Sequence, residues 1–137
     1  MKGAKPNLRV VEGGPRRTPP APSWFNDDAK REWRRIMPGL VRRRILTDED
    51  MAAVEAFCLQ SAQVRYFQRV IDGLDDPFVY SSAGAPRPHP AYRSQRDAMA
   101  EARRIGAELG LSPVSRSRPA MVDPGSGQDE WGGLVDD

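Results

Sequence analysis

The chain has 137 residues with a formal net charge of +2, and 39% of them are hydrophobic. This length accommodates one small domain with tails, and a mean hydropathy of −0.64 predicts a small core. Cys58 is the only cysteine, which excludes an intramolecular disulfide and a cysteine-based zinc site. Because there is no apolar run for a membrane span and no signal peptide, we expect a cytoplasmic protein with no membrane contact.

Charge is arranged in blocks of alternating sign. Residues 1–46 carry 12 basic and 4 acidic groups, whereas residues 47–80 carry 2 and 7. Residues 81–120 are basic again, with 7 basic and 3 acidic groups, and residues 121–137 contain 5 acidic groups and no basic one. A basic N-terminal region can bind a polyanion such as nucleic acid, although it can equally serve only to keep the chain in solution.

Three regions follow from composition. Residues 1–23 contain five prolines and the pair Gly13 and Gly14, so they are predicted to form a flexible basic arm. Residues 24–118 carry the helical periodicity and are predicted to be the core. Residues 119–137 are acidic and glycine-rich, which predicts a disordered tail. The fold class is therefore all-α, with a basic arm and an acidic tail.

A first helix is predicted to begin at Asn26 or Asp27. Pro38 and Gly39 should kink or interrupt it, because proline removes a backbone donor and clashes with the preceding turn. Its apolar positions recur at helical spacing and its opposite face is basic. The apolar positions are Ala29, Trp33, Ile36, Met37 and Leu40.

The long stretch 47–74 is predicted to be the central helix. Thr47 suits the N-cap and Asp50 the third helical position, close to a capping box. Its apolar residues share one face, which is too long for so short a chain to cover completely. We therefore expect part of it to meet another helix or another subunit, although an ordinary core helix explains the same pattern.

A short β-hairpin is predicted near residues 78–88, followed by another helix from Pro90. The face of this helix is rich in alanine, which permits close helix approach, and it should pair with the central helix as a long helical hairpin. Gly110 is predicted to cap its end, with Leu111 packing back. A further short helix is predicted from Ser112 to Arg118.

We find no pattern for catalysis in the sequence. His89 is the only histidine and stands between two prolines in a predicted loop. No phosphate-binding loop of the ATPase type is present. Asp48, Glu49 and Asp50 are better explained by a helix start than by a metal, because consecutive helical carboxylates do not converge on one ion. We expect no enzyme activity, no cofactor and no metal.

The ordered motifs resemble those of one protein family. They are EWRRIMPGLVRRRILTDED at residues 32–50, HPAYRSQRDAMAEARRIGAELGLSP at residues 89–113, and the basic, proline-rich opening. Together they resemble the small terminase subunit of tailed bacteriophages, in its compact helical form without a separate winged-helix domain. The resemblance runs from about Lys2 to Arg118, so the acidic tail lies outside it.

The resemblance implies a non-enzymatic ring in the host cytoplasm that recognises viral double-stranded DNA and recruits and regulates the large terminase subunit. Two alternatives stay open: a helix-turn-helix DNA-binding regulator, and an assembly adaptor that does not bind DNA. The predicted DNA-binding residues are Lys2, Lys5, Arg9, Arg16, Arg17, Lys30, Arg31, Arg34, Arg35, Arg42, Arg43 and Arg44.

Two further surfaces are predicted from the apolar positions. The subunit interface of the ring is assigned to Val54, Phe57, Val64, Phe67, Ile71, Ala98, Ala102 and Ile105. In the tail, Trp131, Leu134 and Val135 stand among acidic residues and are predicted to dock on the large subunit. The same tail could instead cover the basic arm and compete with DNA, or be passive.

Overall fold

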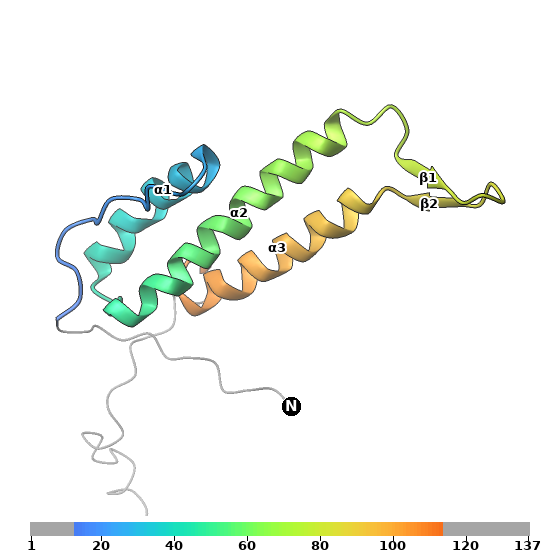
Figure 1. Ribbon diagram of the computed structural model, residues 1–137. Coiled ribbons are helices and arrows are strands. Elements are labelled where there is room, and N and C mark those ends of the chain that lie inside the picture. Colours follow the sequence, from blue (N-terminus) through green and yellow to red (C-terminus); the bar gives the residue numbers. More distant parts are fainter. Residues whose placement is uncertain (1–12, 114–137) are drawn as a thin grey trace, which may run out of the picture.

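The computed structural model describes residues 13–113, and these form three α-helices and one small β-hairpin (Figure 1). The helices are α1 (Asp27–Arg43), α2 (Met51–Asp72) and α3 (Pro90–Glu108), and the strands are β1 (Phe78–Tyr80) and β2 (Pro86–Pro88). The predicted helical fold with a hairpin near residues 78–88 is confirmed. Residues 1–12, the acidic tail and nearly all of the short helix predicted from Ser112 lie outside the described residues.

Helix α2 lies between α1 and α3 (Figure 1). Helices α2 and α3 run antiparallel as a long hairpin, and the paired strands β1 and β2 form its far end. Helix α1 packs beside the first part of α2, so the end of α2 near β1 extends beyond it. The first part of α2 is consequently covered from two sides, and its last turns are covered mainly by α3.

Helix α1 begins where the sequence predicts, because the Asn26 side chain accepts a hydrogen bond of 2.9 Å from the backbone N–H of Ala29. The predicted interruption at Pro38 is wrong, since the helix continues to Arg43. Pro38 is exposed, whereas Met37 and Leu40 on either side of it are fully buried. The free energy gained by burying these side chains offsets the cost of the backbone hydrogen bond that Pro38 cannot donate, so the helix stays continuous.

The start of the central helix is held by the predicted capping box. Asp50 accepts hydrogen bonds from the backbone N–H of Thr47, at 2.8 Å, and from its hydroxyl, at 3.0 Å. The first turn, Asp48–Asp50, is a 3-10 helix, and α2 follows it. The buried residues of α2 all lie in its first 12 positions, before Gln63: Val54, Phe57, Cys58 and Ala62.

Both predicted ends of α3 are confirmed. Pro90 opens the helix, and His89 Nδ1 accepts a hydrogen bond of 3.1 Å from the backbone N–H of Ala91. Gly110 takes the left-handed conformation at φ 72°, and the N–H of Leu111 donates to the carbonyl of Gly106 at 2.8 Å. This is a Schellman ending, which turns Leu111 back onto the core.

The face of α3 that packs on α2 is made of small residues. Ala91, Ala98 and Gly106 are buried, and a methyl group added at Gly106 would lie 3.1 Å from the ring of Phe57. Gln95 is also buried here, and its amide donates to the Val64 carbonyl at 3.2 Å and to Gln68 at 2.8 Å. The small side chains therefore allow the close helix approach that the sequence predicts.

The segment before α1 is packed on the core for part of its length. Gly14 approaches Leu46 so closely that an added Cβ would lie 2.0 Å from the Leu46 carbonyl oxygen. Further along, Trp33 Nε1 donates a hydrogen bond of 2.9 Å to the Pro19 carbonyl. Phe25 then packs edge-on against Trp33, with ring centroids 5.9 Å apart. Residues 14–25 thus run back along α1 toward its N-cap.

Candidate functional site

The solvent face of α1 carries a stripe of arginines. Arg31, Arg34, Arg35 and Arg42 are exposed, and their spacing of three or four residues, with Pro38 between them, places them along one side of the helix. The stripe extends over roughly 16 Å at about 1.5 Å per residue. It is the main concentration of predicted DNA-binding residues in the part of the chain that the structure describes.

The arginines of this stripe differ in their partners. Arg31 pairs with Asp28 at 3.7 Å, and Arg35 pairs closely with Glu32 through its Nε and Nη2 atoms. The bond to Glu32 raises the pKa of Arg35, so its charge is fixed at any working pH. Among residues 13–113, no ion pair to Arg34 or Arg42 is found. These two guanidinium groups are therefore exposed to solvent and outside the ion pairs of this stretch.

The remaining predicted DNA-binding residues are dispersed. Arg16 and Arg17 are exposed on the segment that runs back along α1, and Lys30 is half-buried. Arg43 is engaged inside the protein, because its Nη1 donates to the Gly110 carbonyl at 2.7 Å and its Nε to the Gly39 carbonyl at 3.3 Å. Lys2, Lys5 and Arg9 lie outside the described residues.

Arg44 has a distinct backbone role. It ends α1 in the left-handed conformation at φ 55°, and its N–H donates to the Val41 carbonyl at 3.0 Å. It is exposed. Of the three consecutive arginines, Arg42 and Arg44 therefore face solvent, whereas Arg43 joins helices α1 and α3.

An ion-pair cluster between α1 and α2 was not predicted from the sequence. Asp28 accepts from Arg69 at 2.8 Å, and the buried Glu32 lies 3.7 Å from Arg65. The two carboxylates are four residues apart from each other on α1, and the two arginines are four residues apart from each other on α2. This matched spacing is the signal that could have indicated the pairing, since each pair forms one stripe on its helix. The cluster fixes the register of the two helices.

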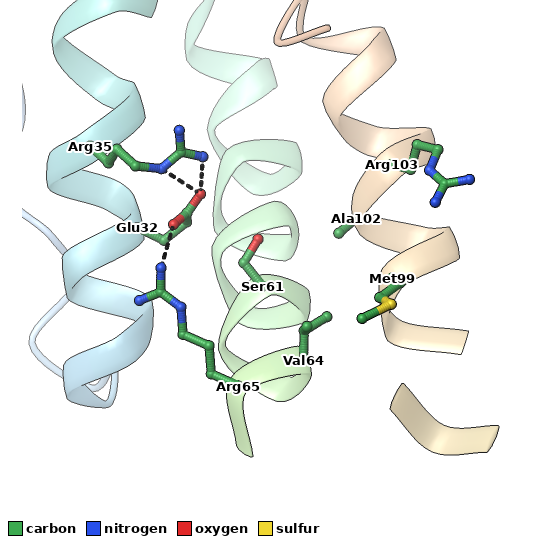
Figure 2. Close-up of a pocket in the computed structure, with 8 residues that line it drawn as sticks. All are labelled: Glu32, Arg35, Ser61, Val64, Arg65, Met99, Ala102 and Arg103. Carbon is green, nitrogen blue, oxygen red and sulfur yellow. Dashed lines mark hydrogen bonds and ion pairs between the residues drawn. The ribbon is translucent and has the colours of Figure 1, made fainter. Parts of the chain in front are cut away.

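A groove of about 370 Å³ lies across the three helices beside this cluster. Figure 2 shows the lining: Met99 and Ala102 point from α3 toward α2, Arg65 reaches toward Glu32, and Arg103 lies on the outer side of α3. The complete lining is Glu32, Arg35, Ser61, Val64, Arg65, Met99, Ala102 and Arg103. The groove combines an apolar floor with an excess of positive charge.

Helix α3 adds arginines that were not among the predicted DNA-binding residues. Arg93, Arg96 and Arg103 are exposed on it, and the basic excess of residues 81–120 was the sequence signal for them. Arg104 differs, because it bonds Glu101 at 2.8 Å and Glu108 at 3.1 Å. This exposed pairing lowers the pKa of Glu101 and leaves Arg104 less able to contact an anion.

The predicted subunit interface divides into two groups. Val54, Phe57, Ala98 and Ile105 are buried in the core of this chain, so their side chains are already covered. The half-buried members are Val64, Phe67, Ile71 and Ala102. The first three lie in the second half of α2, toward β1. The predicted docking residues Trp131, Leu134 and Val135 lie outside the described residues.

The β-hairpin presents a further apolar surface. Phe78, Val79 and Tyr80 of β1 are all exposed, and β1 pairs with β2 in antiparallel register, Val79 opposite Arg87. The Tyr80 hydroxyl donates to Asp76 at 2.8 Å, and this bond raises the pKa of Tyr80. The outer edge of β1 is open to pairing, whereas that of β2 is blocked, because Pro86 and Pro88 have no backbone N–H to donate.

His89 has a structural role, since it caps α3. Within residues 13–113, no group of histidine, cysteine, aspartate and glutamate side chains could hold a metal ion. Over the same stretch, no helix is long and apolar enough to cross a bilayer.

Comparison with known proteins identifies the family of the chain. The family model described as "Phage terminase, small subunit" matches residues 29–125, a stretch that includes nearly all of α1 and the whole of α2 and α3. No curated protein and no solved structure matches the chain. Since the match covers well over half of the 137 residues, the chain belongs to the phage terminase small subunit family, whose role is in phage DNA packaging.

Proposed function

We propose that this protein is the non-enzymatic subunit that recognises viral double-stranded DNA and recruits and regulates the large terminase subunit. The observation that carries the proposal is the family match over residues 29–125, because it spans nearly all of the helical core. In this proposal the protein works in the host cytoplasm as a homo-oligomeric ring. It supplies binding surfaces, and the large subunit supplies ATP hydrolysis and DNA cleavage.

The arginine stripe of α1 supports a role in DNA binding. Arg34 and Arg42 are exposed, and Arg16 and Arg17 add charge beside the same helix. Lysine and arginine contacts to phosphates release condensed counterions, so such a surface binds DNA with little dependence on sequence. A ring repeats the stripe once per subunit, which turns a few modest contacts into a continuous basic surface.

The second half of α2 supports assembly. Val64, Phe67 and Ile71 are only half-buried there, and Tyr66 is exposed with its ring packed edge-on against Phe67. Burial of such side chains against a neighbouring copy is favourable by about 25 cal/mol per Å² of apolar surface. We propose that Phe67 and Ile71 form the subunit contact, whereas Val64 and Ala102 line the groove beside it.

The helix-turn-helix alternative is disfavoured by the surroundings of α2. As the second helix, α2 would have to insert its first turns into the major groove. Those turns follow the acidic residues Asp48, Glu49 and Asp50, and Val54 and Cys58 are fully buried. The second candidate is an adaptor that binds only the large subunit, because a positively charged face on α1 can exist in a protein that does not bind DNA.

A binding experiment with the large terminase subunit of the same phage tests the proposal. We expect the full-length protein to bind the large subunit and to change its ATPase rate, and removal of residues 120–137 to abolish that binding while leaving DNA affinity nearly intact. A matched control removes the apolar anchor alone, as Trp131→Ala, and should weaken large-subunit binding in the same direction. If neither the large subunit nor duplex DNA binds the full-length protein, the proposal is wrong.

A further inference from the structure

The groove across the three helices has a floor and rims of different chemistry. Val64 and Ala102 lie in the floor and Met99, 40% exposed, stands beside it. Arg35 and Arg65 lie on one side, and Arg103 lies on the outer side of α3 (Figure 2). The volume of about 370 Å³ falls within the usual range for sites that take a compact group.

The charge of the lining defines what the groove can bind. Three arginines and one carboxylate line it, which leaves an excess of two positive charges. Glu32 is buried and already bonded to Arg35 and Arg65, so it offers little to a cationic ligand. An apolar floor beneath a positive rim fits a peptide with an apolar anchor flanked by acidic residues.

The C-terminal segment of this chain has that composition. Residues 119–137 contain five acidic residues and no basic one. Trp131 follows Asp129 and Glu130 directly, and Leu134 and Val135 precede Asp136 and Asp137. A tryptophan buries a large apolar area with few rotatable bonds, which makes it an effective anchor for a short peptide.

The segment is also long enough to reach the groove. The structure describes the chain as far as Pro113, and Ala102 in the floor lies six residues before the end of α3 at Glu108, or roughly 9 Å at about 1.5 Å per residue. Trp131 lies 18 residues after Pro113, and a chain of that length spans up to about 60 Å. The groove is therefore within reach of the same molecule.

We propose that residues 119–137 bind in cis in the groove lined by Val64, Met99 and Ala102, with Trp131 over the floor and the acidic residues beside Arg35 and Arg103. Bound in this way, the segment covers its own apolar anchor. The inference goes beyond the proposed role in packaging, and its test requires neither DNA nor the large subunit.

The three tryptophans of the chain provide the measurement. Trp33 is buried at 3% exposure and Trp24 is 64% exposed, so they are internal references for covered and open indole rings. The full-length protein is labelled with 5-fluorotryptophan, and the fluorine resonances are assigned by single Trp→Phe variants. The shift of each resonance between H₂O and D₂O reports its contact with solvent. We expect the value for Trp131 to lie nearer to that of Trp33 than to that of Trp24.

Variants that place a negative charge in the groove locate the binding site. Met99→Glu and Arg103→Glu change exposed residues of the groove and should move the Trp131 value to that of Trp24. Arg93→Glu makes the same charge change as Arg103→Glu on an exposed position of α3 outside the groove, and should leave Trp131 covered. An unchanged Trp33 resonance shows that each variant is folded.

Three results would overturn the proposal. Trp131 could be as open as Trp24 in the unmodified protein, in which case the segment is unbound. Trp131 could stay covered in both groove variants, which would place it elsewhere. The third result is binding to a second copy of the chain, and co-expression tests it. The Met99→Glu chain, which carries Trp131, is produced and labelled together with a Trp131→Phe chain whose groove is intact. Recovery of a covered Trp131 in that mixture would mean that the groove binds the segment of a second copy.

Discussion

Arg43 donates a hydrogen bond of 2.7 Å from Nη1 to the carbonyl oxygen of Gly110, and so connects the end of α1 to the end of α3. The two residues are 67 positions apart in the chain. Gly110 is the left-handed residue of the Schellman ending, so its carbonyl is presented by the turn that closes α3. The bond shows that one of three consecutive arginines serves the fold, whereas its neighbours face solvent.

This bond leads to a prediction on stability. Arg43→Ala should lower the free energy of unfolding by about 1.5–3 kcal/mol, the usual contribution of a hydrogen bond to a charged group. Arg42→Ala is the matched control, because Arg42 is exposed on the same turn, and it should change stability by no more than about 0.5 kcal/mol. Urea denaturation followed by circular dichroism measures both. Equal stabilities for the two variants would show that the Gly110 contact is unimportant.

A second prediction concerns DNA. Arg34→Ala and Arg42→Ala should each reduce the slope of log affinity against log salt concentration by about 0.9 for every phosphate that the variant no longer neutralises. Arg104→Ala is the control, since the Arg104 guanidinium is bonded to Glu101 and Glu108. Fluorescence anisotropy with a labelled duplex at several salt concentrations gives the slopes. If the two α1 variants keep the slope of the unmodified protein, the DNA-binding surface lies elsewhere.

A third prediction separates assembly from folding. Ile71→Asp adds a charge to the half-buried second half of α2, so it should prevent assembly while the helix content is kept. Val54→Asp places the same charge at a fully buried position and should unfold the chain. Gln63→Asp, at an exposed position of α2, should do neither. Light scattering and circular dichroism distinguish the three, and an Ile71→Asp protein of unchanged mass would exclude this part of α2 from the interface.

A fourth prediction follows from Cys58. Burial raises the pKa of its thiol to about 12, against an ordinary value of 9.0, so the folded chain keeps a proton that the unfolded chain loses as pH rises above 9. This contribution to stability is complete below pH 9 and is lost as pH rises from 9 toward 12, by at most about 1.4 kcal/mol per pH unit.

The comparison of Cys58→Ala with the unmodified protein isolates this effect from the other groups that titrate in alkali. We expect the urea midpoints of the two proteins to converge as pH rises from 8 to 10. Midpoints that stay a constant distance apart over that range would show that the thiol does not titrate differently in the folded and unfolded chains.

The elements of the fold that were predictable are those encoded by local signals. Pro90 and Gly110 mark the two ends of α3 by their own backbone preferences, and Thr47 with Asp50 marks the start of the central helix. Pro38 misled the prediction because a local rule was outweighed by burial of the residues around it. Local chemistry fixes where helices begin and end, whereas packing decides whether a proline is tolerated.

The candidate sites were less predictable, because they depend on which helix faces meet. The arginines of α1 predict one basic surface, yet Arg35 pairs with a buried carboxylate and Arg43 binds the end of α3. Half of the residues predicted for the subunit interface are buried within this chain, because α3 packs on the face of α2 that was predicted to contact a second subunit. Apolar periodicity identifies a face to be covered, but not whether the same chain covers it.

Native mass spectrometry of the full-length protein, alone and with duplex DNA, determines whether the protein is a ring that binds DNA. We expect a single closed assembly of several identical subunits, together with a second species heavier by one duplex. A monomer or dimer at working concentration, with no DNA-bound species at low salt, would contradict it.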